Sequence, residues 1–258
     1  MQKKLYPNKI KHFLLLFVIS LFLATPFILM QDLLSLEISQ ILMFIAFIVS
    51  FIGLTFLFNF KRKVKVELNL KLKAERQIPL MILIIVIFQI GFTKPFNHLI
   101  KLALGQNLIL TNPLDAFLTT IGAIFLGSIF EEIIFRGMVL KGFLLTYSPK
   151  KAIIFSAIFF GIIHANPFQI WGAIILGLFF GWIFYKTRSI GNTIILHFFA
   201  NFIILIQSYL YFSFLDIHSV TILSVISIPI ATIALSFLVR KLLRDMNEKT
   251  ILIVEDQL

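Results

Sequence analysis

The amino-acid sequence predicts an all-α membrane protein, a polytopic bundle of about eight transmembrane helices. Hydrophobic residues make up 59% of the 258 positions, 31 of them phenylalanine, and only 14% are charged. Soluble domains are near half apolar and about a quarter charged. The apolar residues also gather in runs of roughly 20, the length that crosses a bilayer. This composition excludes a soluble enzyme, a secreted domain and a disordered chain.

Eight apolar runs are candidate spans. They lie at about 12–30, 38–60, 78–100, 114–140, 151–165, 168–186, 190–213 and 218–239. The apolar run of the third ends early, near Phe92, and the chain continues through Lys94, Pro95 and His98, where we expect it to leave the membrane or to lie along its surface. We expect the fifth to be short because His164 and Pro167 interrupt it.

The two ends of the chain are expected to differ in structure. The run at 12–30 follows four lysines and has no small-residue cleavage site after it, so we expect it to persist as a helix. The C-terminal tail from Arg240 is short and mixed in charge, so we expect it to fray.

No segment between the runs is long enough to fold alone, which predicts a single membrane domain over 1–258. The absence of cysteine excludes disulfides, thiolate metal sites and a Cys nucleophile.

The net charge of +11 has a topological explanation. All but three of the 23 lysines and arginines lie in segments that the alternation of spans places on one side of the membrane. These segments are the N-terminus, 61–76, 141–151, 186–188 and the tail. Because cytoplasmic loops are rich in Lys and Arg, we expect a cell-membrane protein with both termini cytoplasmic. The same distribution argues against a nucleic-acid partner, and it predicts contact between 61–76 and anionic lipid headgroups.

Five ionisable residues lie inside the spans: Glu131, Glu132, Arg136, His164 and His197. A charge at the bilayer centre costs roughly 2.5–3.5 kcal/mol even on lenient scales, so such residues usually face the protein interior and mark a functional site. Glu132 and Arg136 are four residues apart, which favours a structural ion pair on one helix face. One arginine neutralises one glutamate, so Glu131 still needs water, a proton or a histidine.

His197 and Asn201 also share a helix face, and both can donate hydrogen bonds to an oxyanion. The alternative is a structural hydrogen-bonded pair between helices. With a rise of ~1.5 Å per residue, Glu131, His164 and His197 lie about 14–20 Å from the cytoplasmic boundary. Three helices thus bring polar side chains to one layer, which favours the catalytic interpretation.

Several intramembrane chemistries are excluded by missing residues. The sequence has no Gly-x-Ser-x-Gly and no His-Glu-x-x-His, and all of its aspartates lie in loops or tails. A carboxylate, two histidines and an amide remain. This set suits general-base activation of water. It also suits a mononuclear site for a divalent metal such as zinc, with Glu131, His164 and His197 as ligands.

Three motifs follow one another on successive predicted helices. They are Glu131-Glu132-x-x-x-Arg136, Phe160-x-x-x-His164 and His197-x-x-x-Asn201. In this order they resemble the CPBP family, the CAAX proteases and bacteriocin-processing enzymes, over a core of roughly 115–210. The resemblance implies an intramembrane endopeptidase with a bundle of mostly eight helices.

The resemblance also implies a role for each motif residue. Glu131 would activate the attacking water as general base, and His164 would help to hold that water. His197 and Asn201 would stabilise the tetrahedral oxyanion, while the ion pair would orient its helix. The family has been described both as metalloproteases and as glutamate enzymes that need no metal, so the metal stays open.

Other functions and several substrates also stay open. A proton-coupled transporter could use Glu131, His164 and His197 as a relay, although the paired halves typical of transporters are not evident. A non-catalytic scaffold or bacteriocin-immunity membrane protein would use the same residues structurally. For an endopeptidase, the substrate is a membrane-associated peptide or protein. CAAX processing needs a prenylated one, and a signal, leader or pheromone peptide is the alternative.

Overall fold

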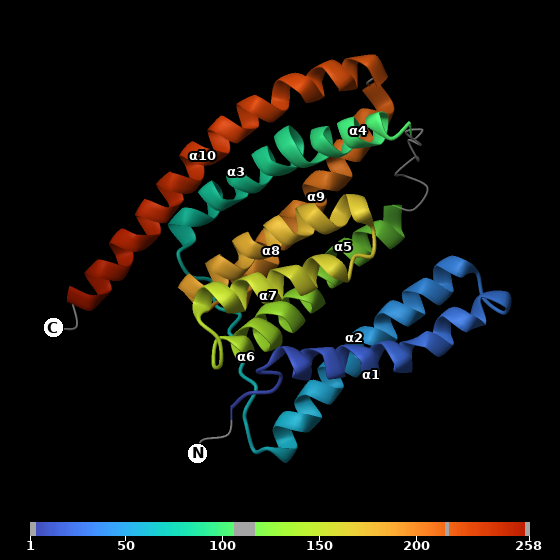
Figure 1. The fold of residues 1–258 in the computed structure, drawn as a ribbon, viewed down its shortest axis with the longest axis vertical. Helices are drawn as coiled ribbons and strands as arrows, with labels where there is room; N and C mark the ends of the chain where they lie inside the picture. Colours follow the sequence, from blue (N-terminus) through green and yellow to red (C-terminus); the bar gives the residue numbers. More distant parts are fainter. Residues whose placement is uncertain (1–3, 106–116, 215–216, 256–258) are drawn as a thin grey trace. The chain divides into compact units, whose positions relative to one another are not determined.

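The computed structural model describes residues 4–105, 117–214 and 217–255, which are largely helical and contain no strand (Figure 1). Six helices in the described residues are long and apolar enough to cross a membrane. They are Ile10–Asp32, Ile38–Lys61, Glu75–Ala103, Pro167–Thr187, Ile190–Gln207 and His218–Asn247. The protein is therefore a multi-pass helical membrane protein, as the sequence predicts.

The predicted fourth span is helical but changes its geometry partway. Helix α5 (Phe117–Glu132) leads into a π-helical segment (Ile133–Leu140) and then into the short α6 (Lys141–Phe143). The first predicted residues of this span, 114–116, lie outside the described residues.

The predicted fifth span is α7 (Pro149–Ile162), which has 14 residues. At ~1.5 Å per residue it is about 21 Å long, shorter than the roughly 30 Å hydrocarbon core. His164 consequently lies in the turn that follows α7, and the next residue, Ala165, has a left-handed φ of 52°. Helix α8 (Pro167–Thr187) begins directly after this turn.

The predicted third span, 78–100, is one continuous helical stretch that extends past Phe92. Helix α3 (Ile78–Phe88) continues through a π-helical segment (Gln89–Thr93) into α4 (Lys94–Ala103). The polar residues of α4 do not end the helix because they find partners. His98 is 6% exposed, and its Nε2 lies 2.8 Å from Thr221 Oγ1 of the last helix.

The C-terminal tail is helical rather than frayed. Helix α10 runs from Ile217 to Glu255, well beyond Arg240. Leu242 and Met246 are one turn apart and are 1% and 6% exposed. This buried stripe explains why the helix continues past the apolar run.

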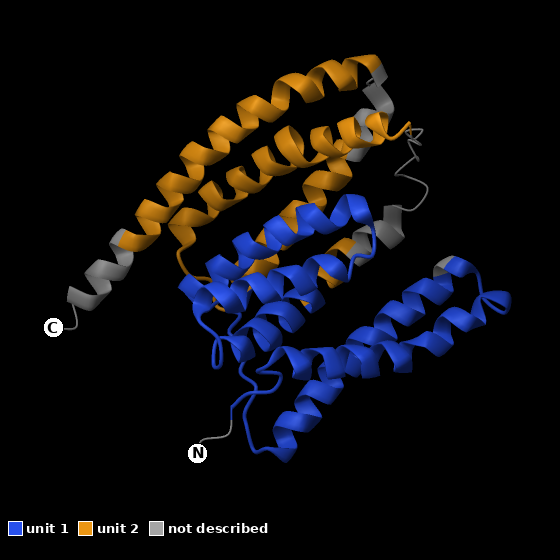
Figure 2. Ribbon diagram, in the orientation of Figure 1, with its two compact units in different colours: residues 1–70, 130–190 blue, residues 71–129, 191–258 orange. Residues whose placement is uncertain are grey.

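The chain divides into two compact units, shown in Figure 2. Unit 1 comprises Met1–Leu70 and Phe130–Ile190. In it, α1 (Ile10–Ile28) packs against α2 (Leu36–Lys61), and α7 packs against α8. The π-helical segment after α5 contacts α2, α7 and α8. Unit 1 therefore surrounds the C-terminal half of the predicted fourth span with helices.

Unit 2 comprises Lys71–Ile129 and Gly191–Leu258. Its helix α10 lies along α3, the π-helical segment after α3, and α4. Unit 2 also contains most of α5 and of α9 (Ile190–Phe214), where the rings of Phe125 and Phe198 meet edge to face at 5.8 Å.

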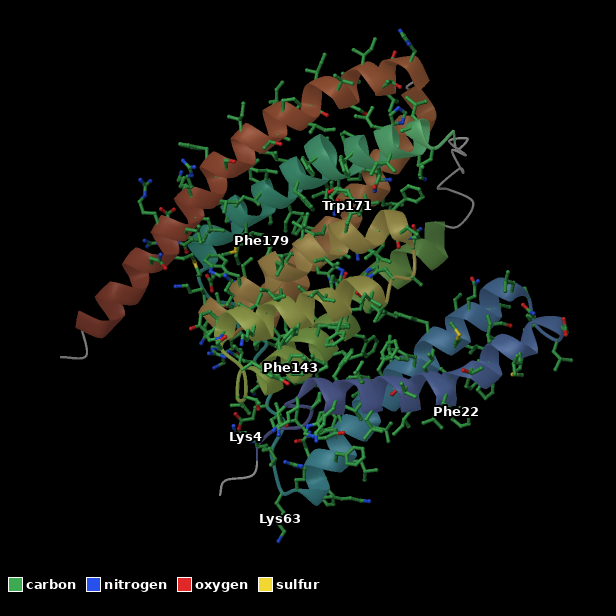
Figure 3. The ribbon with its side chains drawn as sticks, in the orientation of Figure 1. Lys4, Phe22, Lys63, Phe143, Trp171 and Phe179 are labelled. Carbon is green, nitrogen blue, oxygen red and sulfur yellow. The ribbon has the colours of Figure 1, made fainter. Side chains whose placement is uncertain are left out.

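Large apolar side chains project outward from both units. Phe22 of α1 is 76% exposed and points away from its helix in Figure 3, and Ile233 of α10 is 73% exposed. Exposed apolar surface on this scale is typical of a protein whose outer faces contact lipid.

Candidate active site

The two adjacent glutamates lie where α5 changes into π-helical geometry. Glu131 and Glu132 are the last residues of α5, and the wider turn starts at Ile133. Every residue from Ile134 to Leu140 is buried. Short π-helical turns inside α-helices occur frequently at functional sites. This turn follows directly on the pair of carboxylates that the sequence singles out.

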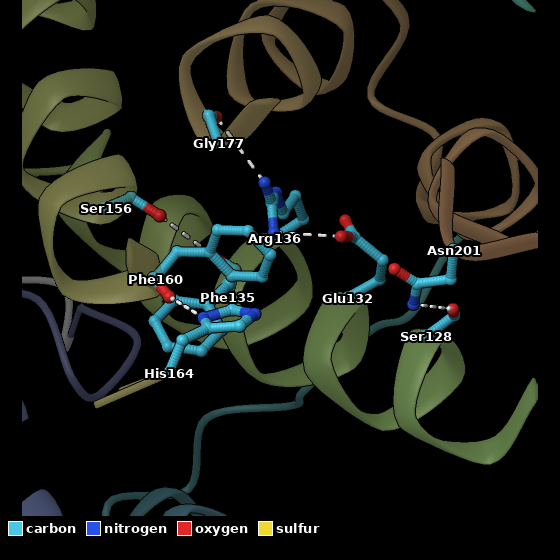
Figure 4. Close-up of polar contacts among 9 residues, drawn as sticks. All are labelled: Ser128, Glu132, Phe135, Arg136, Ser156, Phe160, His164, Gly177 and Asn201. Carbon is cyan, nitrogen blue, oxygen red and sulfur yellow. Dashed lines mark hydrogen bonds and ion pairs between the residues drawn. The ribbon is translucent and has the colours of Figure 1, made fainter. Parts of the chain in front are cut away.

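The ion pair expected from the spacing of Glu132 and Arg136 is present. Arg136 Nη1 donates to Glu132 Oε1 at 2.9 Å, and the two side chains are 1% and 0% exposed (Figure 4). The pair forms across the junction between the two helical geometries. Charge-assisted hydrogen bonds of this kind are shorter and stronger than neutral ones, so the pair holds the junction in one conformation.

The guanidinium of Arg136 has three further neighbours in unit 1. Its Nη2 donates to the carbonyl oxygen of Gly177 at 3.4 Å. Its Cζ lies 4.5 Å from the ring centre of Phe160 and 5.5 Å from that of Phe180. Cation–π contacts are worth about 2 kcal/mol when desolvated. The buried charge is thus compensated by a carboxylate, a carbonyl and two aromatic faces.

Gly177 permits this arrangement because α8 approaches α7 closely there. A Cβ at position 177 would lie 3.1 Å from the Cα of Ala157 and 3.2 Å from Cδ1 of Phe160. Such contacts are tighter than side chains normally accept. Glycine therefore brings the backbone of α8 near enough for its carbonyl to reach Arg136.

His164 is fixed by the carbonyl at the end of its own helix. Its Nδ1 lies 2.9 Å from the carbonyl oxygen of Phe160. The backbone N–H of His164 bonds instead to Gly161 O at 3.2 Å, so the side chain takes the position of the missing helical donor. Because a carbonyl only accepts, Nδ1 carries the hydrogen, which leaves Nε2 as the acceptor in the neutral form of the ring.

Phe160 connects the arginine to the histidine. Its ring meets the ring of His164 edge to face at 5.2 Å and that of Phe135 at 5.3 Å, and the same ring lies over Arg136 (Figure 4). Ser156 Oγ donates to the carbonyl of Phe135 at 3.3 Å, a second link between α7 and the π-helical segment. The phenylalanine of the second motif thus couples the position of His164 to the ion pair.

The third motif lies on α9 in unit 2. His197 is 4% exposed. Asn201, one turn later on the same face, donates through Nδ2 to Ser128 Oγ at 3.2 Å. The Ser128 hydroxyl donates in turn to the carbonyl of Ile124 at 2.6 Å. The amide of Asn201 has a second N–H, which the bond to Ser128 does not use.

Ser128 is the residue that sequence reasoning missed. It is 1% exposed and lies one turn before Glu132 on α5. The available signal was its position four residues before Glu132, on the same helix face. Serine in a membrane helix commonly bonds its own backbone, however, and this gave no reason to single it out.

The predicted catalytic residues divide between the two units. Glu131 and His164 belong to unit 1, whereas His197 and Asn201 belong to unit 2. Unit 1 thus positions the carboxylate and one histidine, and unit 2 positions the second histidine and the amide. That all four act on one substrate stays a prediction.

A metal site was the alternative use of Glu131, His164 and His197. Neither unit, within its described residues, brings together three or more His, Asp or Glu side chains that could hold a metal ion. The donor set expected for a mononuclear zinc site is three protein ligands with an open position. The residues within one unit do not supply such a set.

A comparison with protein families assigns part of the chain. Residues 113–203 match the family model described as type II CAAX prenyl endopeptidase Rce1-like. This stretch contains all three motifs, and the match confirms the resemblance to the CPBP family. It supports CAAX-type intramembrane protease activity in general. No curated protein and no solved structure matches the chain.

The buried ion pair generates the first testable prediction. Replacing one partner, in Arg136→Ala or Glu132→Ala, is expected to destabilise the protein by about 3–5 kcal/mol, because an uncompensated charge stays in the interior. Arg136→Lys is expected to be nearly as damaging, since lysine cannot reproduce the forked hydrogen bonds or the aromatic stacking. Equilibrium denaturation in mixed micelles measures the loss.

The double variant Glu132→Leu/Arg136→Leu serves as the control. It removes both charges and is expected to recover much of the stability lost in the single variants. Single variants as stable as the wild type would contradict the role given to the pair.

Proposed function

Given that residues 113–203 match the type II CAAX prenyl endopeptidase family, we propose that the protein is an intramembrane endopeptidase for membrane-associated peptides or proteins. One observation carries the assignment of roles. Of two adjacent carboxylates, Glu132 is fully buried against Arg136, whereas Glu131 is half-buried. Neighbouring titratable groups in contrasting environments take different roles in catalysis. Glu132 is structural, and Glu131 carries the chemistry.

The reaction begins with a water molecule beside Glu131. The carboxylate takes a proton from this water while the oxygen attacks the carbonyl carbon of the scissile peptide bond. Nε2 of His164 accepts a hydrogen bond from the same water, since Nδ1 is committed to the carbonyl of Phe160. Two acceptors orient the attacking lone pair toward the substrate.

Addition of the oxygen produces a tetrahedral oxyanion. His197 and Asn201 donate hydrogen bonds to it from one face of α9. The bond from Asn201 Nδ2 to Ser128 supports this role, because it restrains the amide and keeps one N–H for the oxyanion. Ser128 is a positioning residue in this scheme.

The intermediate collapses when the peptide C–N bond breaks. The proton held by Glu131 passes to the leaving nitrogen, which departs as an amine, and the former carbonyl becomes a carboxylic acid. Glu131 returns to its ionised form, so one water is consumed for each bond cleaved. No step passes through a metal.

We place the protein in the cell membrane with both termini in the cytoplasm, on the distribution of lysine and arginine. The substrate is then bound within the lipid bilayer, and a lipidated cysteine is one way to hold a peptide there. A signal, leader or pheromone peptide is held instead by its own apolar residues. Matched peptides with and without a farnesyl group separate these classes.

The proposed roles predict which variants lose activity. Glu131→Gln, His197→Ala and Asn201→Ala are each expected to lower kcat by about 10²-fold or more, because each removes a group that acts in the transition state. Cleavage of the matched farnesylated and unmodified peptides, followed by mass spectrometry, measures the effect.

Ser128→Ala tests the positioning role beside these variants. It is expected to lower kcat by less than about tenfold, with KM unchanged, since it releases the amide of Asn201 without removing it. The exposed Phe22→Ala is the matched control for expression and folding. Full activity of both Glu131→Gln and His197→Ala would refute the proposed site.

Metal removal provides an independent prediction. Protein treated with chelators and shown by elemental analysis to lack zinc is expected to keep its activity, because Glu131 alone serves as the base. Activity lost on chelation and restored by added zinc would show that Glu131 and the histidines act as ligands instead.

A further inference from the structure

A segment after α2 has the sequence pattern of a β-strand although no strand lies beside it in the described residues. From 63 to 73 the sequence is Lys-Val-Lys-Val-Glu-Leu-Asn-Leu-Lys-Leu-Lys, a strict alternation of polar and apolar residues. The segment has no helical structure, and left-handed residues bracket it, Lys63 with φ of 57° and Ala74 with φ of 53°. Its first part, 64–70, belongs to unit 1.

One edge of this segment is bonded to the protein. The carbonyl oxygen of Glu67 accepts from Lys141 Nζ at 2.6 Å, and that of Asn69 accepts from the backbone N–H of Ile190 at 2.8 Å. In an extended chain the N–H and C=O groups of successive residues point to opposite sides. The odd-numbered residues therefore turn their backbone groups toward unit 1.

The backbone N–H of Val64 still bonds to Asn59 O at 2.9 Å, and from Val66 on the even-numbered residues turn their backbone groups away. Among the described residues, the backbone N–H and C=O groups of Val66, Leu68 and Leu70 have no hydrogen bond. We call this row of groups the outer edge of 64–70. An open edge with unpaired donors and acceptors is a template for pairing with another extended chain.

The outer edge belongs to a segment that packs against the helix of the two glutamates. A Cβ at Gly137 would lie 2.8 Å from Cδ2 of Leu68 and 3.0 Å from Cδ1 of Ile190. Gly137 thus lets the extended segment lie directly on the π-helical turn. It is six residues after Glu131, about 9 Å along a helix.

The charge of the segment indicates the kind of chain that it binds. Lys65 Nζ lies 3.4 Å from Glu67 Oε1, so these i, i+2 side chains share one face, as in a strand. Both are solvent-exposed, at 85% and 66% of their side chains. Within 64–70 the charges of Lys65 and Glu67 balance, and the positive charge comes from the flanking residues, Lys63 before the edge and Lys71 and Lys73 after it. Complementarity therefore favours an acidic partner.

We propose that the outer edge of 64–70 binds an extended, acidic stretch of the peptide substrate by β-strand addition. Backbone hydrogen bonds then supply affinity, and alternate side chains supply selectivity. This proposal rests on the proposed function and names the part of the substrate that is recognised outside the scissile bond. The edge holds the substrate extended beside the helix of Glu131, and an extended backbone is the form that a hydrolytic site can attack.

Backbone hydrogen bonding can be tested from the peptide side. The probe is a nine-residue acidic peptide of non-repeating sequence, labelled with a fluorophore and N-methylated at one amide at a time. Binding is measured by anisotropy with the full-length Glu131→Gln protein in discs of neutral lipid. Every second N-methyl group is expected to weaken binding by about three- to tenfold, the worth of one hydrogen bond, with no change at the intervening positions.

Two protein variants match this series. Leu70→Pro removes an outward N–H at a position that is 59% exposed, whereas Leu70→Ser removes only the side chain. The proline variant is expected to weaken binding about threefold or more, and the serine variant by less than twofold. A peptide with lysine in place of each acidic residue is expected to bind about fivefold more weakly.

Three results would overturn the proposal. One is an N-methyl scan without a period of two. Another is Leu70→Ser weakening binding as much as Leu70→Pro. The third is binding of the peptide only to discs that contain anionic lipid, since the lysines would then recognise a membrane surface. Measuring binding on Glu131→Gln keeps this test apart from catalysis. Period-two binding of the probe, together with no cleavage of the matched farnesylated and unmodified peptides by the wild-type protein, would uphold the edge and contradict the protease.

Discussion

The ion pair between Glu132 and Arg136 is the interaction on which unit 1 depends. Two charges with 0% and 1% exposure are stable in a bilayer protein only if each is compensated at close range. The 2.9 Å contact provides part of this compensation. The remainder comes from the carbonyl of Gly177 and the rings of Phe160 and Phe180. Arg136 thus restricts where Phe160 of α7 and Gly177 and Phe180 of α8 can lie, because these residues surround its buried charge.

This requirement carries over to the chemistry. Phe160 contributes its ring to Arg136 and its carbonyl to His164, so the histidine is oriented by a residue whose place the ion pair sets. Glu131 precedes Glu132 on the same helix, so the ion pair that fixes Glu132 also restricts where Glu131 lies. A structural charge pair and the carboxylate proposed as the base therefore occupy consecutive residues, and the pair holds the helix on which that carboxylate lies. The third motif has its own support, since Ser128 restrains Asn201 within unit 2.

Composition and motif spacing predicted the long helices and the ion pair from the sequence. Apolar runs identified six long helices correctly because length and hydropathy decide whether a helix crosses a bilayer. The i, i+4 spacing gave the ion pair because a helix places such residues together. The sequence was less informative where tertiary contacts decide how far a helix extends. His98 does not end its helix because Thr221 lies beside it, and the tail after Arg240 stays helical because Leu242 and Met246 are buried.

The sequence singled out the candidate site residues, but it did not single out the residues that hold them in place. Glu131, His164, His197 and Asn201 stand out because polar groups are costly in apolar helices. Gly177, Phe180 and Ser128 are ordinary residues of membrane helices, and only packing shows what they contact. The segment 63–73 lies within the loop 61–76, for which the charge predicts contact with anionic lipid headgroups. The alternation of polar and apolar residues in this segment was the stronger signal, because it is the pattern of an extended strand. The hydrogen bonds agree with it, since Glu67 and Asn69, two residues apart, both accept from unit 1.

The central claim is that Glu131 activates water and does not itself attack the peptide. The most direct measurement is a single turnover in water enriched in oxygen-18, with protein in excess over a cleaved peptide. The account predicts that the new carboxyl terminus carries solvent oxygen in the first turnover, because no atom of the protein enters the product. An unlabelled product in that turnover would contradict the account, since its oxygen would then have come from a protein carboxylate through a covalent intermediate.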